Sequence, residues 1–262
     1  MLKQLNRHER DEHIVFEEKN HSYFVDGDPN YISVTTAIKE FFPKFDSDLV
    51  ISKMKKSNNW SKSAYFGMED ADIKKQWRDK ADLAANLGTL LHASIENYYN
   101  NIDQIIDPRI EKEYGQFLRF RDFIKENRPE LEPYRTEWCV YNEDYHISGS
   151  IDMIFKDKET DELHIFDWKR TPDMKKENRW DTGLAPICHL DDCKFIHYSL
   201  QLNIYKFILE EKYDKKVKSL TLVCFHPTND EYFLEKVDDF QDEIRNILQA
   251  SFHQQLHVKS AL

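Results

Sequence analysis

The sequence predicts an α/β fold in which a central mixed sheet is flanked by helices, in the order helix, three strands, helix, strand. Two observations predict this fold. Apolar residues first recur at helical spacing over residues 71–100, and the pattern then changes to short β-branched and aromatic segments separated by turn residues. With 262 residues, of which 40% are hydrophobic, the chain can bury one substantial core.

The first 70 residues predict a hairpin and two short helices. Residues Ile14 to Phe16 and Ser22 to Val25 have strand character, and we assign the turn of this hairpin to DGDPN, residues Asp26 to Asn30, because Gly, Pro and Asn favour turns. Helices are predicted from Val34 to Phe41 and from Asp46 to Lys56. The polar stretch KKSNNWSKS that follows predicts a surface loop.

Two longer helices open the predicted core. The first runs from Ala71 to Asn100 as one long helix, and a break near Gly88 is the alternative. The second runs from Pro108 to Glu126 and ends ahead of Pro129, because proline disfavours helical backbone in the residue before it. The apolar side chains of the first helix are predicted to share one broad face: Trp77, Ala81, Ala84, Leu87, Leu91 and Tyr98.

Three strands and a further helix–strand pair complete the core. Arg135 to Tyr141, Ile147 to Phe155 and Leu163 to Lys169 are joined by the turn-like NEDY and KDKETDE, which predicts an antiparallel meander. A helix from Ile196 to Tyr213 and a strand from Ser219 to Phe225 follow. The alternation of helix and strand predicts an α/β layer structure.

We expect one domain over residues 1–262, with an N-terminal elaboration (1–70), a core (71–226) and a C-terminal strand and helix (227–262). The net charge of −11 argues against a protein that coats nucleic acid with its whole surface, but it allows a local basic groove. No apolar run approaches the roughly 20 residues that span a bilayer, and the N-terminus is charged. We therefore expect a soluble intracellular protein with no membrane partner.

The stretch GSIDMIFKDKETDELHIFDWK places charged residues inside two predicted strands. Asp167 and Lys169 share one face because side chains two apart on a strand point the same way. Asp152 lies on the adjacent strand and can approach Asp167. Two facing carboxylates repel unless a cation lies between them, and oxygen ligands suit Mg²⁺ or Mn²⁺. Lys169 would then orient a metal-bound water or stabilise charge on a phosphate; an exposed strand-end ion pair is the alternative for an isolated Asp-x-Lys.

Four short motifs occur in order along the predicted core: GTLLH (Gly88 to His92), GSID (Gly149 to Asp152), FDWK (Phe166 to Lys169) and QLNIY (Gln201 to Tyr205). Together they resemble the PD-(D/E)XK nuclease superfamily, and within it the RecB-like exonuclease branch. The resemblance covers Trp77 to Phe225. The DWK form of the third motif is similar to that of mitochondrial genome-maintenance exonucleases and their viral and phage relatives. It implies a restriction-endonuclease-like core and metal-dependent hydrolysis of DNA.

The resemblance also implies roles for individual residues. Asp152, Asp167 and Lys169 would be catalytic. Gln201 and Tyr205 would support the active site without performing the chemical step, although Tyr205 could equally be a core aromatic. The metal, Mg²⁺ or Mn²⁺, would be held by the following groups: His92, Glu137, Asp152, Asp167 and the backbone carbonyl of Trp168.

The remaining signals concern cofactor and substrate. Gly88, one turn before His92, would allow close approach of a strand or phosphate, or would simply pack against another helix. We expect no iron–sulfur cluster, because Cys188 and Cys193 precede the QLNIY helix instead of forming a tight trio after it. The basic residues that directly follow the FDWK strand are the preferred DNA contacts: Arg170, Lys175 and Lys176.

The expected partner is therefore DNA, either single-stranded or bearing an end, and the expected activity is exonucleolytic, in replication, repair or recombination. An endonuclease acting on RNA or on structured DNA is the alternative enzyme. A catalytically inactive nucleic-acid-binding module is a third possibility, against which the intact Asp152, Asp167 and Lys169 argue. Polarity, the number of metal ions, oligomeric state and protein partners stay open.

Overall fold

A central six-stranded mixed sheet organises the computed structural model, which describes residues 1–20 and 22–260. Its strands follow the order β3-β5-β6-β7-β8, and β4 pairs with β5. The β4/β5, β5/β6 and β7/β8 pairs are antiparallel, whereas β3/β5 and β6/β7 are parallel. The strands are β3 (Ile32–Ser33), β4 (Leu131–Asn142), β5 (Ile147–Asp157), β6 (Leu163–Arg170), β7 (Val217–Phe225) and β8 (Phe233–Lys236).

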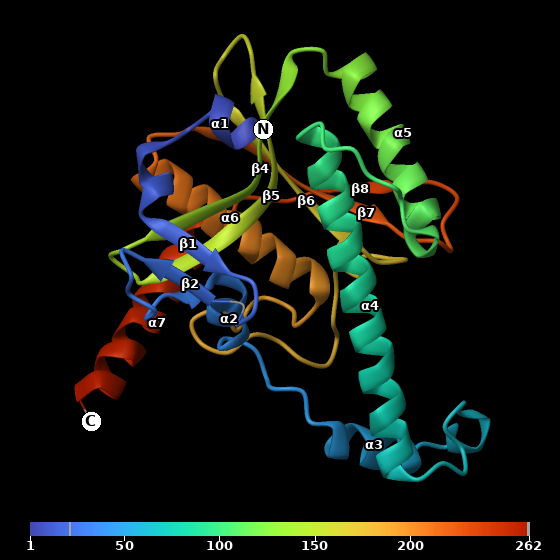
Figure 1. Cartoon of the computed structure of the whole chain (residues 1–262). Helices are drawn as coiled ribbons and strands as arrows, with labels where there is room; N and C mark the ends of the chain where they lie inside the picture. The colour runs from blue at the N-terminus through green and yellow to red at the C-terminus, as the bar shows by residue number, and fades with distance from the viewer. Residues whose placement is uncertain (21, 261–262) are drawn as a thin grey trace.

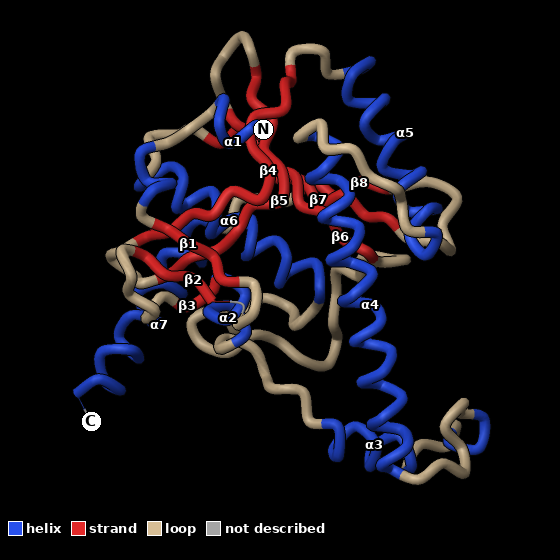
Figure 2. Tube along the Cα trace, viewed as in Figure 1, coloured by secondary structure: helices blue, strands red, loops and turns tan. Residues whose placement is uncertain are grey.

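Helices cover both faces of this sheet (Figures 1 and 2). One core cluster joins α4 (Asp70–Tyr99) and α5 (Glu111–Asn127) to the sheet through Phe166 and Val223. The other joins α2 (Val34–Lys39), α6 (Lys194–Lys212) and α7 (Gln241–Ser260) to it through Ile165 and Leu222. Neighbouring residues of one strand belong to different clusters because successive side chains point to opposite faces. The predicted α/β class with a central mixed sheet is confirmed.

The N-terminal region consists of α1 (Leu2–Leu5), a two-stranded sheet of β1 (Ile14–Glu17) and β2 (Ser22–Val25), and short 3₁₀ helices. Our assignment of its turn to residues 26–30 is wrong: the strands are joined between Glu17 and Ser22, and the glycine-containing turn comes after β2. The 3₁₀ helices of this region are Glu9–Glu12 and Trp60–Lys62, and another, Pro108–Ile110, precedes α5.

Helix α4 is one long helix that continues through Gly88, without the alternative break there. It departs from the prediction in the burial of its first half. Residues 78–86 are all exposed, so Ala81 and Ala84 do not lie on a buried face. The reason is that the first half of α4 extends beyond the sheet. There α3 (Ser47–Lys55) packs beside its start through the buried Ile51 and Ile73 (Figure 1), and the loop residues Phe45 and Tyr65 contact Trp77. We call residues 47–86 the arm.

Among the described residues, no helix combines the length and the apolar character needed to cross a membrane.

Candidate active site

The site lies where β5 and β6 separate. The two strands pair from Lys156 with Leu163 up to Met153 with Phe166, and there the pairing stops. One step further in the same register would place Asp152 opposite Asp167. At this fork the backbone N–H of Trp168 donates a hydrogen bond of 2.8 Å to Asp152 Oδ2. The two carboxylates that the sequence singled out therefore meet at the first unpaired position.

Glu137 extends this row of carboxylates onto β4. The pairs on either side of it, Thr136 with Met153 and Trp138 with Ile151, place Glu137 opposite Asp152. Its φ of +44° lies in the left-handed region, which a non-glycine residue rarely adopts within a strand. Such backbone strain typically costs 1–3 kcal/mol, roughly, and persists only where the surroundings enforce it. The hydroxyl of Ser150 donates a 2.9 Å hydrogen bond to Glu137 Oε2.

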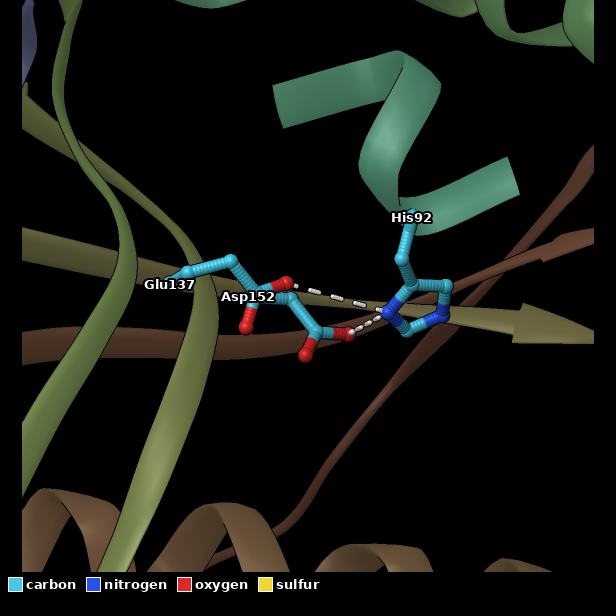
Figure 3. A group of neighbouring side chains, drawn as sticks. All are labelled: His92, Glu137 and Asp152. Atoms are coloured by element: carbon cyan, nitrogen blue, oxygen red, sulfur yellow. Dashed lines mark ion pairs between the residues drawn. The ribbon is translucent and has the colours of Figure 1, made fainter. Parts of the chain in front are cut away.

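His92 reaches the fork from α4 (Figure 3). Its Nε2 lies 3.0 Å from the carbonyl oxygen of Trp168, which can only accept, so Nε2 carries the proton. Nδ1 then presents a lone pair toward Asp152 Oδ2 at 3.5 Å and Glu137 Oε1 at 3.9 Å. Burial and the nearby Lys169 ammonium lower the pKa of His92 to about 4, which keeps the ring neutral.

The three carboxylates hold protons more tightly than they would in water. Burial, together with the charge of Asp152, raises the pKa of Glu137 to about 8. Burial also raises the pKa of Asp152, against the opposing effect of Lys169, and raises that of Asp167 to about 6. This is the behaviour expected of like charges gathered in a partly desolvated place.

Lys169 supplies the one ammonium at this point. Its Nζ lies 2.5 Å from Asp167 Oδ2 and 4.4 Å from the ring centre of Tyr198 on α6. Burial disfavours the ammonium, but the carboxylates of Asp167 and Asp152 outweigh it and raise the pKa of Lys169 above its ordinary value. Lys169 is therefore positively charged at neutral pH.

A divalent cation fits between His92, Glu137 and Asp152. One imidazole nitrogen and two carboxylate oxygens all lie within 4.8 Å of one another, and this nitrogen, Nδ1, carries no hydrogen atom. Facing lone pairs are unfavourable by themselves and favourable around a metal ion. Asp167 stands outside this group: Oδ2 is paired with Lys169, and Oδ1 has no hydrogen-bond partner.

The comparison with protein families agrees with this geometry. The sequence model of the PD-(D/E)XK nuclease superfamily matches residues 64–259, well over half of the chain. The chain belongs to the PD-(D/E)XK nuclease superfamily. It is therefore a nuclease of a class that generally uses divalent metal ions, and the matched span contains His92, Glu137, Asp152, Asp167 and Lys169.

More distant comparisons add little to the assignment of this nuclease. No curated protein matches the chain. A solved structure titled "Crystal structure of SSO0001" covers 97% of this chain and 81% of its own, with 15% sequence identity and a TM-score of 0.33. A likeness that weak supports no statement about function. The assignment to the superfamily therefore rests on the family match and agrees with the site geometry.

The glycine of GSID and the tyrosine of QLNIY explain each other in this nuclease. A Cβ atom on Gly149 would lie 2.7 Å from Cε1 and 2.9 Å from the hydroxyl oxygen of Tyr205. Gln201 Nε2 donates to the same hydroxyl at 3.3 Å. Tyr205 thus packs directly against β5 at Gly149, which lies three residues before Asp152. It therefore helps to set the position of that strand.

Gly88 has no packing role among the described residues. No atom outside its own helix and chain neighbours lies within 4 Å of the position of a Cβ atom, and its φ is not in the left-handed region. The packing alternative is therefore excluded for the described part of the chain. The open space beside Gly88 lies one helical turn from His92, on the same side of α4.

The three basic residues after β6 have unequal freedom. Arg170 Nε donates to the fully buried Glu113 at 2.8 Å, so this guanidinium anchors β6 to α5. Lys176 pairs with Glu235 at 2.6 Å and lies over the ring of Phe195. Lys175 is exposed.

Sequence reasoning did not single out Tyr198 and Ser150, although both contact the site. Tyr198 lies three residues before Gln201 and therefore on the same side of its helix, which was a usable signal. Ser150 stands within GSID itself. The cysteines and histidines around Cys188 and Cys193 form no metal-ligand group among the described side chains.

Proposed function

We propose that this nuclease is a DNA exonuclease of the RecB-like branch, acting on single-stranded or end-bearing DNA in replication, repair or recombination. The observation that carries the proposal is the convergence of His92, Glu137 and Asp152 beside the Lys169–Asp167 pair at the fork. The branch assignment draws on the order of the motifs GTLLH, GSID, FDWK and QLNIY.

His92, Glu137 and Asp152 would hold Mg²⁺ or Mn²⁺, with Asp167 within reach of a rearranged site. The bound ion would supply an activated water and an electrophile for the scissile phosphate. The imidazole ligand favours Mn²⁺ relative to Mg²⁺, which prefers oxygen ligands.

Lys169 would stabilise the negative charge that develops on the phosphate. Its ammonium is held protonated by Asp167 and Asp152 and is oriented by the ring of Tyr198. A fixed positive charge in a partly desolvated site stabilises negative charge in the transition state more than the same positive charge would in water. Asp152 is oriented in turn by the Trp168 N–H, and Glu137 by the Ser150 hydroxyl.

Cleavage of end-labelled DNA tests the proposal. Single-stranded DNA, duplex DNA and RNA would be incubated with Mg²⁺, Mn²⁺ or EDTA, beside Lys169→Ala and with Lys125→Gln, an exposed lysine of α5, as a surface control. Release of mononucleotides or short oligomers from one DNA end, only with metal and only with Lys169, is the expected result.

The other outcomes are equally informative. Internal cuts, or cleavage of RNA alone, would replace the exonuclease by an endonuclease of the same superfamily. Retained nucleic-acid binding with no metal-dependent cleavage of any substrate would leave a binding module. A separate measurement, Mn²⁺ affinity by electron paramagnetic resonance, is expected to fall at least tenfold in His92→Ala.

A further inference from the structure

The tip of the arm is basic in a chain that is otherwise acidic. Residues 49–68 contain four lysines and no aspartate or glutamate, although the whole chain carries a net charge of −11. Lys55 pairs with Asp70, whereas Lys53, Lys56 and Lys62 are exposed and form no ion pair with any described residue. Three unneutralised ammonium groups are therefore available to phosphates at this end of the molecule.

A hollow with a volume of about 510 Å³ opens at the arm tip beside Lys62. The indole of Trp60 forms part of its wall, and the ring of Phe66, itself 58% exposed, lies 6.0 Å from that indole. An aromatic wall beside hydroxyl, amide and ammonium groups is the combination that binds an unpaired nucleotide. The residues that line the hollow are Met54, Ser57, Asn59, Trp60, Lys62 and Ser63.

Three small residues precede His92 on one side of α4, and Lys74 and Arg78 lie further back on the same side. Ala81, Ala85, Gly88 and His92 follow one another at intervals of four, three and four residues and so share one side of the helix. Both alanines are exposed, and the space beside Gly88 is open. A row of small residues means little alone, but here it ends at His92, and the basic side chains behind it lead toward the arm tip.

The length of α4 sets the span between the two places. The helix advances by 22 residues from Asp70, beside the arm tip, to His92, which is about 33 Å at 1.5 Å per residue. A stacked single strand rises by about 3.4 Å per nucleotide, so about ten nucleotides cover this distance.

We propose that the arm tip is a second binding site for single-stranded DNA, which holds an unpaired nucleotide on Trp60 about ten nucleotides away from the metal centre. The inference rests on the proposed function, because the strand it holds is the substrate of the site at the fork. Its consequence is a length threshold: strands that reach the hollow bind more tightly than strands that occupy the metal centre alone.

The test uses the full-length chain with Lys169→Ala, so that DNA is bound in Mg²⁺ without being cut. Fluorescence anisotropy would measure the affinity for oligothymidylates of increasing length, from about 4 to 20 nucleotides, labelled at either end. The affinity is expected to rise steeply near ten nucleotides. Adding Trp60→Ala and Lys62→Gln is expected to remove this rise and weaken binding of the longest strand about tenfold or more, as loss of one stacked base does, without changing the affinity for the shortest.

A matched control and a second variant keep the test decisive. Phe123→Ala with Lys125→Gln removes an exposed aromatic ring and a lysine from α5, outside the arm, and should leave the length dependence intact. The triple variant Lys53→Gln, Lys56→Gln and Lys62→Gln keeps Trp60. It is expected to reduce the slope of log affinity against log salt by about 2, because each phosphate contact to a single strand contributes about 0.7.

The inference and the proposed function fail in different ways. If the arm variants with Lys169 intact cut short and long strands in the same proportion as the parent, and the length threshold persists without Trp60, the second site is refuted while the nuclease stands. If the parent cuts no nucleic acid and does not hydrolyse bis(p-nitrophenyl) phosphate with Mn²⁺, the proposed function fails. Length-dependent binding lost in the arm variants would in that case still establish the second site.

Discussion

Replacing Gly149 by alanine tests whether β5 and α6 are fitted to each other at this glycine. The added methyl carbon would lie 2.7 Å from Cε1, 2.9 Å from the hydroxyl oxygen and 3.2 Å from Cζ of Tyr205. Neither side can yield easily: Tyr205 is only 3% exposed, and Gly149 is paired with Val140 on β4. Overpacking typically costs about 1–3 kcal/mol, and we expect the upper part of this range.

The same substitution should impair catalysis. Asp152 follows Gly149 by three residues, so a strand pushed away from α6 moves the carboxylate row, and a displacement of about 1 Å can lower a rate roughly 100-fold. Urea unfolding followed by circular dichroism gives the free energy of unfolding, and the rate of DNA cleavage at saturating Mn²⁺ gives the activity. Gly115→Ala on α5 is the control, because its methyl group would meet only Arg119 Nη1 at 3.9 Å.

A double variant identifies the clashing partner. With Tyr205→Leu the ring is gone, so the two substitutions together should destabilise by about 1–2 kcal/mol less than the sum of the separate effects, a coupling typical of residues in contact. Strict additivity, or Gly149→Ala as stable as the parent, would refute the reasoning.

Three further predictions concern the helix, the carboxylates and the N-terminal segment. Gly88→Ala should raise the free energy of unfolding by about 1 kcal/mol in urea melts, because alanine is the better helix former and no described atom obstructs the methyl group. The same variant should cleave DNA more slowly at unchanged Mn²⁺ affinity. Undiminished cleavage would show that the DNA does not closely approach α4 at Gly88. In EDTA the raised pKa of Glu137 means that its contribution to stability is full below its ordinary pKa of 4.5 and is lost as pH rises through about 8. Between these pH values the melting temperature should fall less with rising pH in Glu137→Gln than in the parent. Equal slopes of melting temperature against pH would contradict the raised pKa of Glu137. Asp11 has a lowered pKa because the hydrogen bonds and charge of Arg135 outweigh burial, so its contribution is present above its ordinary pKa and disappears as pH falls. Asp11→Asn leaves the Arg135 guanidinium, 2% exposed, unpaired and should cost about 3–5 kcal/mol in urea unfolding at pH 7, and adding Arg135→Met should restore most of it.

The sequence predicted the core elements because their periodicity is strong. The three strands from β4 to β6, helix α6 and strand β7 lie within a few residues of their expected bounds. The short strand β3 was missed, because two residues carry too little pattern. Ala81 and Ala84 were misplaced because helical spacing shows that residues share a side, and not whether anything packs against that side.

The site was predictable in its residue types and less so in its geometry. Strand alternation placed Asp167 with Lys169, and the motif order brought His92 into consideration. The end of the β5/β6 pairing at Met153 and Phe166 is a property of two strands in contact, and no local sequence pattern carries it. The left-handed backbone of Glu137 is likewise imposed by its surroundings.

That backbone has a genetic consequence. Glycine adopts a positive φ without strain, and a glutamate codon becomes a glycine codon through one transition. Glu137→Gly would at once relax the strand, remove a carboxylate that repels Asp152 and delete a metal ligand. In a host that is poisoned by this nuclease, surviving clones should therefore include chains that are inactive yet fold at least as well as the parent, and codon 137 is where sequencing should first look for them.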